Sequence, residues 1–156
     1  MLITATGSML GQLTPRELVE VPLAGKPASD PGAPAPSSDT ATHLAIYRAF
    51  PDAHAVLHGH PACTIALSLD AGRDAIDPFD LEGRNFLGRV PVIDVEWAEQ
   101  AEAVAEALRE APVVVTRGHG PYARGADPWD ALRLVSALEK SARVILLARG
   151  GPSLPA

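Results

Sequence analysis

Two histidines that flank a single glycine, His58 and His60, are the residues of this 156-residue sequence best suited to chemistry. His58 ends an apolar, alternating run over residues 53–58, which predicts a strand. Side chains two apart on a strand share a face, with backbones about 6.6 Å apart, so both imidazoles can reach one metal ion. Taken alone, the pair fits a metal site and two ordinary strand-end histidines about equally well.

A third histidine, His119, stands between two glycines shortly after the apolar run over residues 113–116. Glycines permit backbone shapes that aim a side chain out of a turn at the end of a buried strand. Alone, His119 is most simply a turn residue that faces solvent. Together with His58 and His60 it gives the three imidazoles that hold a catalytic zinc, which keeps one position open for water or substrate.

Asp39 follows Ser37 and Ser38 at the predicted start of a helix. The simplest role of such an aspartate is to cap the helix and to interact with its dipole. The alternative is a carboxylate beside a metal, as a ligand or as a proton-transfer group. His43 lies four residues later on the same helix face, where packing or a hydrogen bond to a ligand is expected.

Two turns could hold a phosphate group, namely Thr6-Gly7 after the first strand and Ser37-Ser38 at the helix start. Backbone N–H groups and hydroxyls in such places point at an anion. The nucleotide-binding pattern Gly-x-Gly-x-x-Gly is absent, which argues against a nucleotide. Ordinary turn chemistry is the simpler interpretation of either turn.

Four further residues are expected to have structural roles, and for one of them, Arg117, anion binding is an alternative. Cys63, in a helix predicted over residues 61–69, is expected to be a buried and inert thiol. Arg117 either binds an anion or, more simply, forms a surface ion pair. Trp97 and Trp129 open predicted helices and are expected to pack against the core.

Strands and helices alternate along the chain, which predicts an α/β architecture with a sheet covered by helices on both faces. Further strands are predicted over residues 2–5, 19–23, 90–95 and 113–116. Further helices are predicted over residues 37–50, 97–110 and 127–149, the last with an apolar stripe that includes Leu132. Thr14 and Glu17 form a capping box. Residues 24–36 predict a Gly- and Pro-rich loop, and residues 70–89 show no regular pattern.

Composition restricts the class of protein further. Hydrophobic residues make up 47% and charged residues 21%, which suits a single domain over residues 1–156. The net charge of −6 argues against nucleic acid and anionic membrane surfaces as partners. The single cysteine cannot form an internal disulfide. No apolar run approaches the ~20 residues of a membrane span, so a cytoplasmic protein is expected.

Taken in order, these motifs resemble the class II aldolase/adducin family, and within it most closely the L-fuculose-phosphate aldolase-like proteins. The resemblance covers nearly the whole chain, and a His-x-His-Pro motif followed by a later His-Gly is a specific combination. The matching segments are residues 2–7, 13–19, 37–39 with His43 and Tyr47, 55–61 and 117–120.

The resemblance implies a three-layer α/β/α sandwich with a central mixed, mostly antiparallel sheet. It also implies a homotetramer with a zinc site near a subunit boundary. Matched residue by residue, it implies three metal ligands, a phosphate site made of two turns, and an acid/base carboxylate. The implied metal ligands are His58, His60 and His119. The implied phosphate site is made of Thr6, Gly7, Ser37 and Ser38, and the implied acid/base carboxylate is Asp39. Asp39 is one methylene shorter than the glutamate that the family's aldolases carry there.

Two further departures from the family follow from the same match. The chain begins where the family already has an N-terminal helix and strand, so these elements and their phosphate-binding Gly-Asn segment are expected to be absent. No tyrosine matches the catalytic tyrosine of the aldolases, and the aromatic residue between Glu82 and Val90 is Phe86.

The implied function is a zinc-dependent aldehyde-lyase that cleaves a small ketose phosphate such as fuculose 1-phosphate. The zinc would bind the substrate's carbonyl and hydroxyl oxygens and stabilise the enediolate left by C–C cleavage, while Asp39 moves a proton. A sugar-phosphate epimerase or dehydratase of the same family stays open, because the same enolate serves all three reactions. A non-catalytic, adducin-like scaffold is the alternative outside enzymes, and a scaffold has no need of three such histidines.

Overall fold

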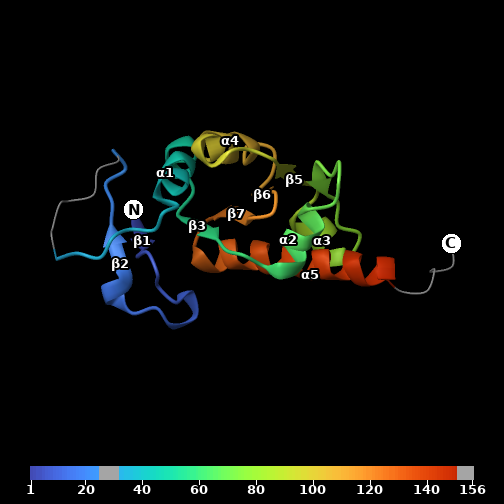
Figure 1. The fold of residues 1–156 in the computed structure, drawn as a ribbon, viewed down its shortest axis with the longest axis horizontal. Coiled ribbons are helices and arrows are strands. Elements are labelled where there is room, and N and C mark those ends of the chain that lie inside the picture. Colours follow the sequence, from blue (N-terminus) through green and yellow to red (C-terminus); the bar gives the residue numbers. More distant parts are fainter. Residues whose placement is uncertain (25–31, 151–156) are drawn as a thin grey trace.

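The computed structural model of the protein describes residues 1–24 and 32–150 (Figure 1). Most of the loop predicted over residues 24–36 lies outside these residues. The five-stranded central sheet contains β3 (Ala55–His58), β4 (Ala75–Ile76), β5 (Val90–Ile93), β6 (Val113–Thr116) and β7 (Gly120–Gly125). Its strand order is β3-β7-β6-β5-β4. Only β5 and β6 run parallel, so the sheet is mixed and mostly antiparallel.

Helices cover both faces of this sheet, as Figure 1 shows. The α-helices are α1 (Thr40–Ala49), α2 (Ala62–Ser68), α3 (Leu81–Phe86), α4 (Gln100–Ala107) and α5 (Pro128–Gly150). Short 3-10 turns are η1 (Leu10–Gln12), η2 (Pro15–Glu17) and η3 (Trp97–Glu99). α1 and α4 pack together on one face, and α2 and α3 pack along α5 on the other. The predicted three-layer α/β/α sandwich with a mixed sheet is confirmed.

The central strand β6 shows why the sheet needs two helical layers. All four of its residues are buried. Val113 and Val115 belong to the apolar core under α5, and Val114 belongs to the core under α1 and α4. A strand that is apolar on both faces is stable only when both faces are covered.

The long helix α5 buries the predicted apolar stripe except at its first position. Leu132 is 41% exposed, whereas Leu134 is 4% exposed and packs against the sheet. Val135, Leu138 and Ile145 are buried as expected. At the start of the helix the buried face therefore contains Leu134 in place of Leu132, because the angle at which α5 meets the sheet decides which side chains are buried.

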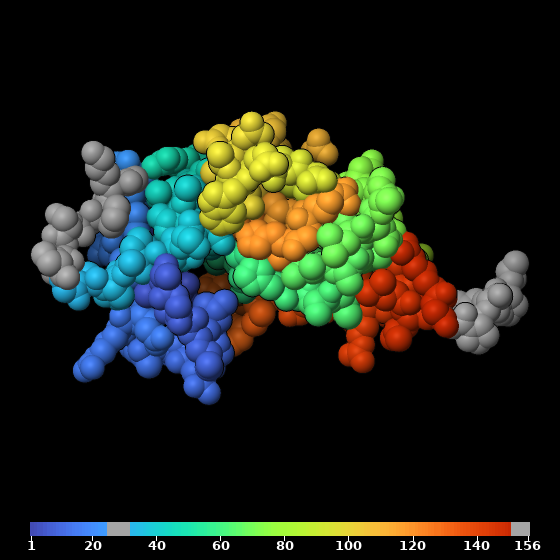
Figure 2. All heavy atoms as spheres, in the orientation of Figure 1, coloured from blue at the N-terminus to red at the C-terminus, as the bar shows by residue number. Residues whose placement is uncertain are grey.

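The first residues form a small two-stranded sheet apart from the main one. β1 (Leu2–Thr4) pairs antiparallel with β2 (Leu18–Glu20), and the predicted capping box between Thr14 and Glu17 opens η2. Ile3, Val19 and Leu44 form a minor core that joins this sheet to α1. Figure 2 shows the N-terminal part, in blue, projecting beside the body of the protein.

Three expectations about single regions were wrong. Residues 70–89 contain β4 and α3, which their glycines and prolines concealed. Trp97 and Trp129 are 58% and 78% exposed rather than packed. Cys63 is only half-buried. Within the described residues, no helix has both the length and the apolar character that crossing a membrane requires.

Candidate metal centre

Three histidines meet at one end of the sheet. His58 is the last residue of β3, His60 follows two residues later, and His119 lies in the turn between β6 and β7. One ring nitrogen of each lies within 4.8 Å of the others. The structure thus brings together the three imidazoles that the sequence singled out as metal ligands; we call them the three-histidine cluster.

Strand pairing explains this convergence of residues that are far apart in the sequence. β7 pairs with both β3 and β6, so the β6–β7 turn lies beside the end of β3. Gly120 begins β7 and approaches Gly59 so closely that a β-carbon there would lie 2.2 Å from the Gly59 carbonyl oxygen. The φ of Gly120 is +152°, which side chains rarely adopt. Glycine at position 120 therefore lets the two segments meet.

His58 is held in one orientation by its surroundings. Its Nδ1 lies 3.0 Å from the carbonyl oxygen of Pro121, an acceptor to which only a protonated nitrogen can donate. Nε2 then carries the lone pair, 3.1 Å from Nε2 of His60 and 3.4 Å from Oδ2 of Asp39. Burial lowers the pKa of His58 to about 4, so its imidazole is neutral at pH 7, as a metal ligand must be.

The other two histidines lie nearer the surface. His60 is exposed, and His119 is half-buried. Burial also lowers the pKa of His119. The ring of Trp97 lies edge-on to that of His119, 5.9 Å between centroids. The three-histidine cluster is therefore accessible to a small molecule from the side of His60.

Asp39 lies against this cluster and is 7% exposed. It stands at the N-cap position of α1, but its side chain makes no capping hydrogen bond, so the simpler expectation for this residue was wrong. Its Oδ1 instead accepts a hydrogen bond of 2.7 Å from the Tyr122 hydroxyl. Its Oδ2 faces His58. The carboxylate thus borders the possible metal position.

Two buried residues of this site were missed from the sequence. Tyr122 is fully buried and stacks on His58, with centroids 4.1 Å apart and ring planes at 14°. Gln100, at the start of α4, donates to the Tyr122 hydroxyl at 2.9 Å. The β3–β7 register pairs His58 with Tyr122, and the packing of α4 on α1 brings Gln100 to them. No motif in the sequence indicates that register.

His43 lies behind the site, as its position on α1 predicted. Its ring is half-buried and lies edge-on to Tyr122 at 6.3 Å. Burial lowers the pKa of His43, which favours the neutral form. Packing is therefore its observed role.

The two turns predicted to hold phosphate lie side by side. Ala5 and Pro36 form a β-bridge, and the Thr6 hydroxyl donates to the Pro36 carbonyl at 2.8 Å. The backbone N–H groups of Thr6 and Ser37 are engaged by the carbonyls of Ala35 and Thr4. Gly7 and Ser38 donate no backbone hydrogen bond within the described residues, so they supply the backbone donors that an anion could use.

Arg117 has a structural role and is not available to an anion. Its guanidinium donates to the carbonyls of Ser68, Asp70 and Arg73 and forms an ion pair of 2.9 Å with Asp94. These contacts hold the turn that contains His119 against the end of α2.

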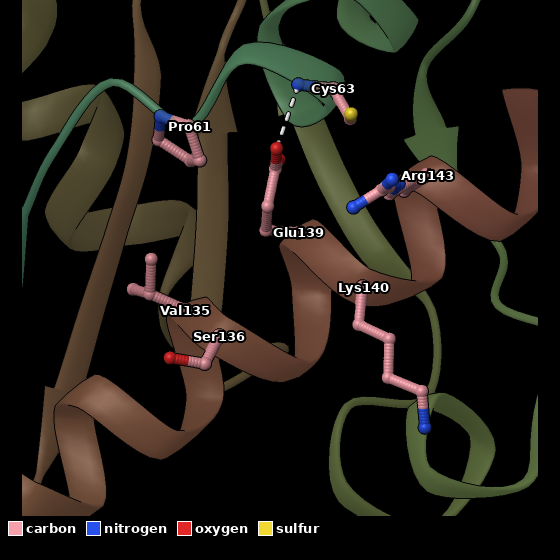
Figure 3. Close-up of a pocket in the computed structure, with 7 residues that line it drawn as sticks. All are labelled: Pro61, Cys63, Val135, Ser136, Glu139, Lys140 and Arg143. Carbon is pink, nitrogen blue, oxygen red and sulfur yellow. Dashed lines mark hydrogen bonds between the residues drawn. The ribbon is translucent and has the colours of Figure 1, made fainter.

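The pocket shown in Figure 3 lies elsewhere, between α2 and α5. Its volume is about 540 Å³, and it is lined by Pro61, Cys63, Val135, Ser136, Glu139, Lys140 and Arg143. The Glu139 carboxylate points at the start of α2, where it accepts the Cys63 N–H at 2.9 Å. None of the residues predicted to bind metal or phosphate lines this pocket.

The donor set of the three-histidine cluster fits a divalent transition metal. Three imidazoles with a neighbouring carboxylate are the ligand types that zinc and similar ions prefer. The hydrogen bond from His58 to Pro121 is the outer contact that orients such a ligand. His60 is exposed, so a substrate oxygen could approach a metal ion in the cluster from that side.

Comparison with known proteins identifies the family of this chain. The chain matches the family described as Class II Aldolase and Adducin N-terminal domain over residues 1–146. It is 32% identical over 146 residues to the L-fuculose phosphate aldolase of Methanocaldococcus jannaschii, covering 93% of this chain and 77% of that protein. It is 34% identical over 154 residues to the methylthioribulose-1-phosphate dehydratase of Granulibacter bethesdensis, covering 88% and 71%.

A solved structure gives the same result for the fold. The crystal structure of L-fuculose-1-phosphate aldolase from Thermus thermophilus superposes with a TM-score of 0.85 at 37% identity, over 98% of this chain and 82% of that one. Other relatives have different activities in their names, among them 3-oxo-tetronate 4-phosphate decarboxylase and L-ribulose-5-phosphate 4-epimerase. Together these matches confirm the expected family: the chain belongs to the class II aldolase and adducin N-terminal domain family.

Proposed function

We propose that this protein is a zinc-dependent aldehyde-lyase that cleaves a small ketose phosphate, such as fuculose 1-phosphate. The observation that supports this most is the three-histidine cluster with Asp39 at its edge: three ring nitrogens within 4.8 Å of one another and a carboxylate oxygen 3.4 Å from His58 Nε2. The name and 37% identity of the Thermus aldolase point to the same chemistry.

In this proposal His58, His60 and His119 hold the metal. When bound, a divalent cation supplies Lewis-acid chemistry, because it withdraws electron density from a carbonyl oxygen. The chain's own contribution begins with the His58 tautomer, since the Nδ1 hydrogen bond to Pro121 leaves Nε2 unprotonated. Oδ2 of Asp39 faces the same point and is the group that would move the proton at the carbon from which the aldehyde leaves.

The substrate phosphate would bind near Thr6, Gly7, Ser37 and Ser38. Ser38 precedes Asp39 directly, so a phosphate there would lie one residue from the acid/base group. The Gly7 and Ser38 N–H groups would be the donors. We also propose a homotetramer, as the family resemblance implies, and a cytoplasmic location, which the single cysteine favours.

A dehydratase is the second candidate, because the Granulibacter relative with that name is 34% identical to this chain. Loss of water from a ketose phosphate requires the same activation of a carbonyl oxygen and the same movable proton. The two reactions differ in products, since the lyase releases a shorter phosphate ester and an aldehyde whereas the dehydratase keeps the carbon chain whole.

The test is a product assay with zinc-loaded protein. Fuculose 1-phosphate should yield a three-carbon ketose phosphate, measured by coupling its reduction to NADH oxidation. Asp39→Asn should lower the rate by about 10²–10⁴-fold, while His54→Ala, an exposed histidine outside the cluster, should leave it unchanged. Zinc-bound protein that leaves fuculose 1-phosphate intact but dehydrates methylthioribulose 1-phosphate would replace the first proposal by the second.

A further inference from the structure

We propose that Tyr122 and Gln100 are positioning residues that hold the Asp39 carboxylate against the three-histidine cluster. The inference rests on the proposed function, since it assumes that Asp39 acts at a metal in that cluster. It concerns two side chains that touch neither the possible metal position nor a substrate, and that act through Asp39.

The direction of the hydrogen bonds is fixed by chemistry. An ionised carboxylate can only accept, so the Tyr122 hydroxyl donates to Oδ1 of Asp39 over 2.7 Å. The tyrosine oxygen then accepts from Nε2 of Gln100 over 2.9 Å. The hydrogen bonds therefore run in one direction: Gln100 donates to Tyr122, and Tyr122 donates to Asp39.

The amide of Gln100 is oriented by the same logic. Its Nε2 also lies 3.4 Å from Oδ1 of Asp39 and 3.4 Å from the hydroxyl oxygen of Thr42. The reversed amide would place its carbonyl oxygen against the carboxylate, where two acceptors repel. The nitrogen therefore faces Asp39, and it adds a second, longer donor to the same oxygen.

These contacts are shielded from water. Tyr122 is 0%, Thr42 3%, Gln100 4% and Asp39 7% exposed. A buried acceptor that loses its donor leaves a polar atom unsatisfied, which is unfavourable. Asp39 Oδ1 is therefore held firmly, and the only oxygen left to face the three-histidine cluster is Oδ2.

Tyr122 fixes both partners of the contact between Asp39 and His58. Its ring stacks on the His58 ring at 4.1 Å, because the two residues are opposite each other on β7 and β3. Its hydroxyl holds the carboxylate. One side chain thus sets the position of the imidazole and of Oδ2, and the 3.4 Å between them depends on it.

Without the hydrogen bond from Tyr122, the Asp39 side chain could cap α1 instead. It stands at the N-cap of α1, where an aspartate ordinarily accepts from the backbone N–H groups of the first turn, yet it makes no such bond here. Removing the Tyr122 hydroxyl would release the carboxylate toward that role. The second donor from Gln100, at 3.4 Å, is too long to prevent it alone.

The test compares two tyrosine-to-phenylalanine variants in the same chain. Tyr122→Phe keeps the ring and removes only the hydroxyl. Tyr47→Phe is the matched control, because this half-buried tyrosine of α1 has its hydroxyl near the backbone of Val56 and not near Asp39. Co²⁺ is titrated into metal-free protein, and both the dissociation constant and the visible absorption of the bound ion are recorded. Circular dichroism checks that each variant folds.

Tyr122→Phe should bind Co²⁺ about 10–100-fold more weakly, the usual effect of losing an outer contact that orients the side chains around a metal. Its Co²⁺ absorption should shift toward that of Asp39→Asn, which reports the altered carboxylate directly. Tyr47→Phe should match the wild type in both. Gln100→Met, which removes both amide donors at similar length, should shift the spectrum in the same direction and decides the matter if Tyr122→Phe does not fold.

Two failures can be told apart. If the wild-type protein binds no Co²⁺, the proposed function is refuted and this inference with it. If the wild type binds Co²⁺ and the folded Tyr122→Phe and Gln100→Met proteins have its affinity and spectrum, only the positioning role is refuted.

Discussion

A β-carbon on Gly120 would lie 2.2 Å from the carbonyl oxygen of Gly59, so the two residues that flank the meeting point of β3 and β7 are in a contact that only glycine at position 120 allows. The relationship is not symmetric. A β-carbon on Gly59 would meet no atom within 4 Å. This asymmetry separates a glycine required for the fold from one that is not.

Gly120→Ala should therefore destabilise the protein by about 2–4 kcal/mol, from the clash and the strained φ together. Gly59→Ala should change the free energy of unfolding by less than about 0.5 kcal/mol. Urea denaturation of both variants measures the difference. Equal stabilities of the two would contradict the close approach of the two segments.

His60→Ala should abolish stoichiometric zinc binding without unfolding the protein, because His60 is exposed and contributes little to the core. Elemental analysis after zinc loading and gel filtration measures the bound metal. His54→Ala, also exposed, is the control and should retain a full equivalent. Full zinc occupancy in His60→Ala would count against the three-histidine site.

Arg117→Met should lower the free energy of unfolding by about 2–3 kcal/mol, because it leaves the carbonyls of Ser68, Asp70 and Arg73 without their charged donor. Zinc affinity should fall as well, since these bonds hold the turn that contains His119. The control is Arg84→Met, an exposed arginine of α3. Calorimetry gives both quantities, and an unchanged affinity would separate the turn from the metal site.

Glu139 predicts a pH dependence of stability. Burial would raise its pKa, but the hydrogen bonds that it accepts from the Cys63 N–H and from the Thr64 N–H and hydroxyl outweigh burial and hold the pKa below its usual value. Because the folded pKa is the lower one, this stabilisation is present above the unfolded pKa of about 4.3 and disappears as the pH falls through the folded value.

Glu139→Gln should accordingly lose about 1–2 kcal/mol at pH 7 and show a weaker decline in stability on acidification than the wild type. Thermal unfolding at a series of pH values between neutral and acidic measures this. Glu102→Gln, on the exposed side of α4, should follow the wild-type curve. Parallel curves for Glu139→Gln and the wild type would show that the carboxylate's charge is not what joins α2 to α5.

Those parts of the site that a local sequence pattern specifies could be predicted from the sequence. His58 and His60 share a strand end, and His119 lies between glycines after a buried strand, so their convergence could be predicted from spacing and from the family resemblance. Asp39 could be identified only as one of two alternatives, because the choice between capping α1 and facing His58 depends on a tyrosine 83 positions away.

Tyr122 and Gln100 could not be predicted, since nothing near them in the sequence has a pattern that refers to Asp39. Their roles arise from the β3–β7 register and from the packing of α4 on α1. The short elements β4 and α3 were missed for a related reason. Gly83 suggests a loop, yet it is a helix residue whose β-carbon would lie 2.3 Å from Ser141 Oγ on α5. Tertiary contact, not local preference, selects glycine there.

The strand order β3-β7-β6-β5-β4 has a consequence for when the three-histidine cluster forms during folding. Among the strands that the structure describes, β3 stands at one border of the sheet and pairs with β7, which comes last of these strands in the chain. Until β7 inserts between β3 and β6, the His58–His60 segment and His119 belong to separate pieces of chain. Such non-local closure is a slow event in folding, so the three-histidine cluster forms late, and under the proposed function a metal would bind the completed sheet and would not nucleate its formation.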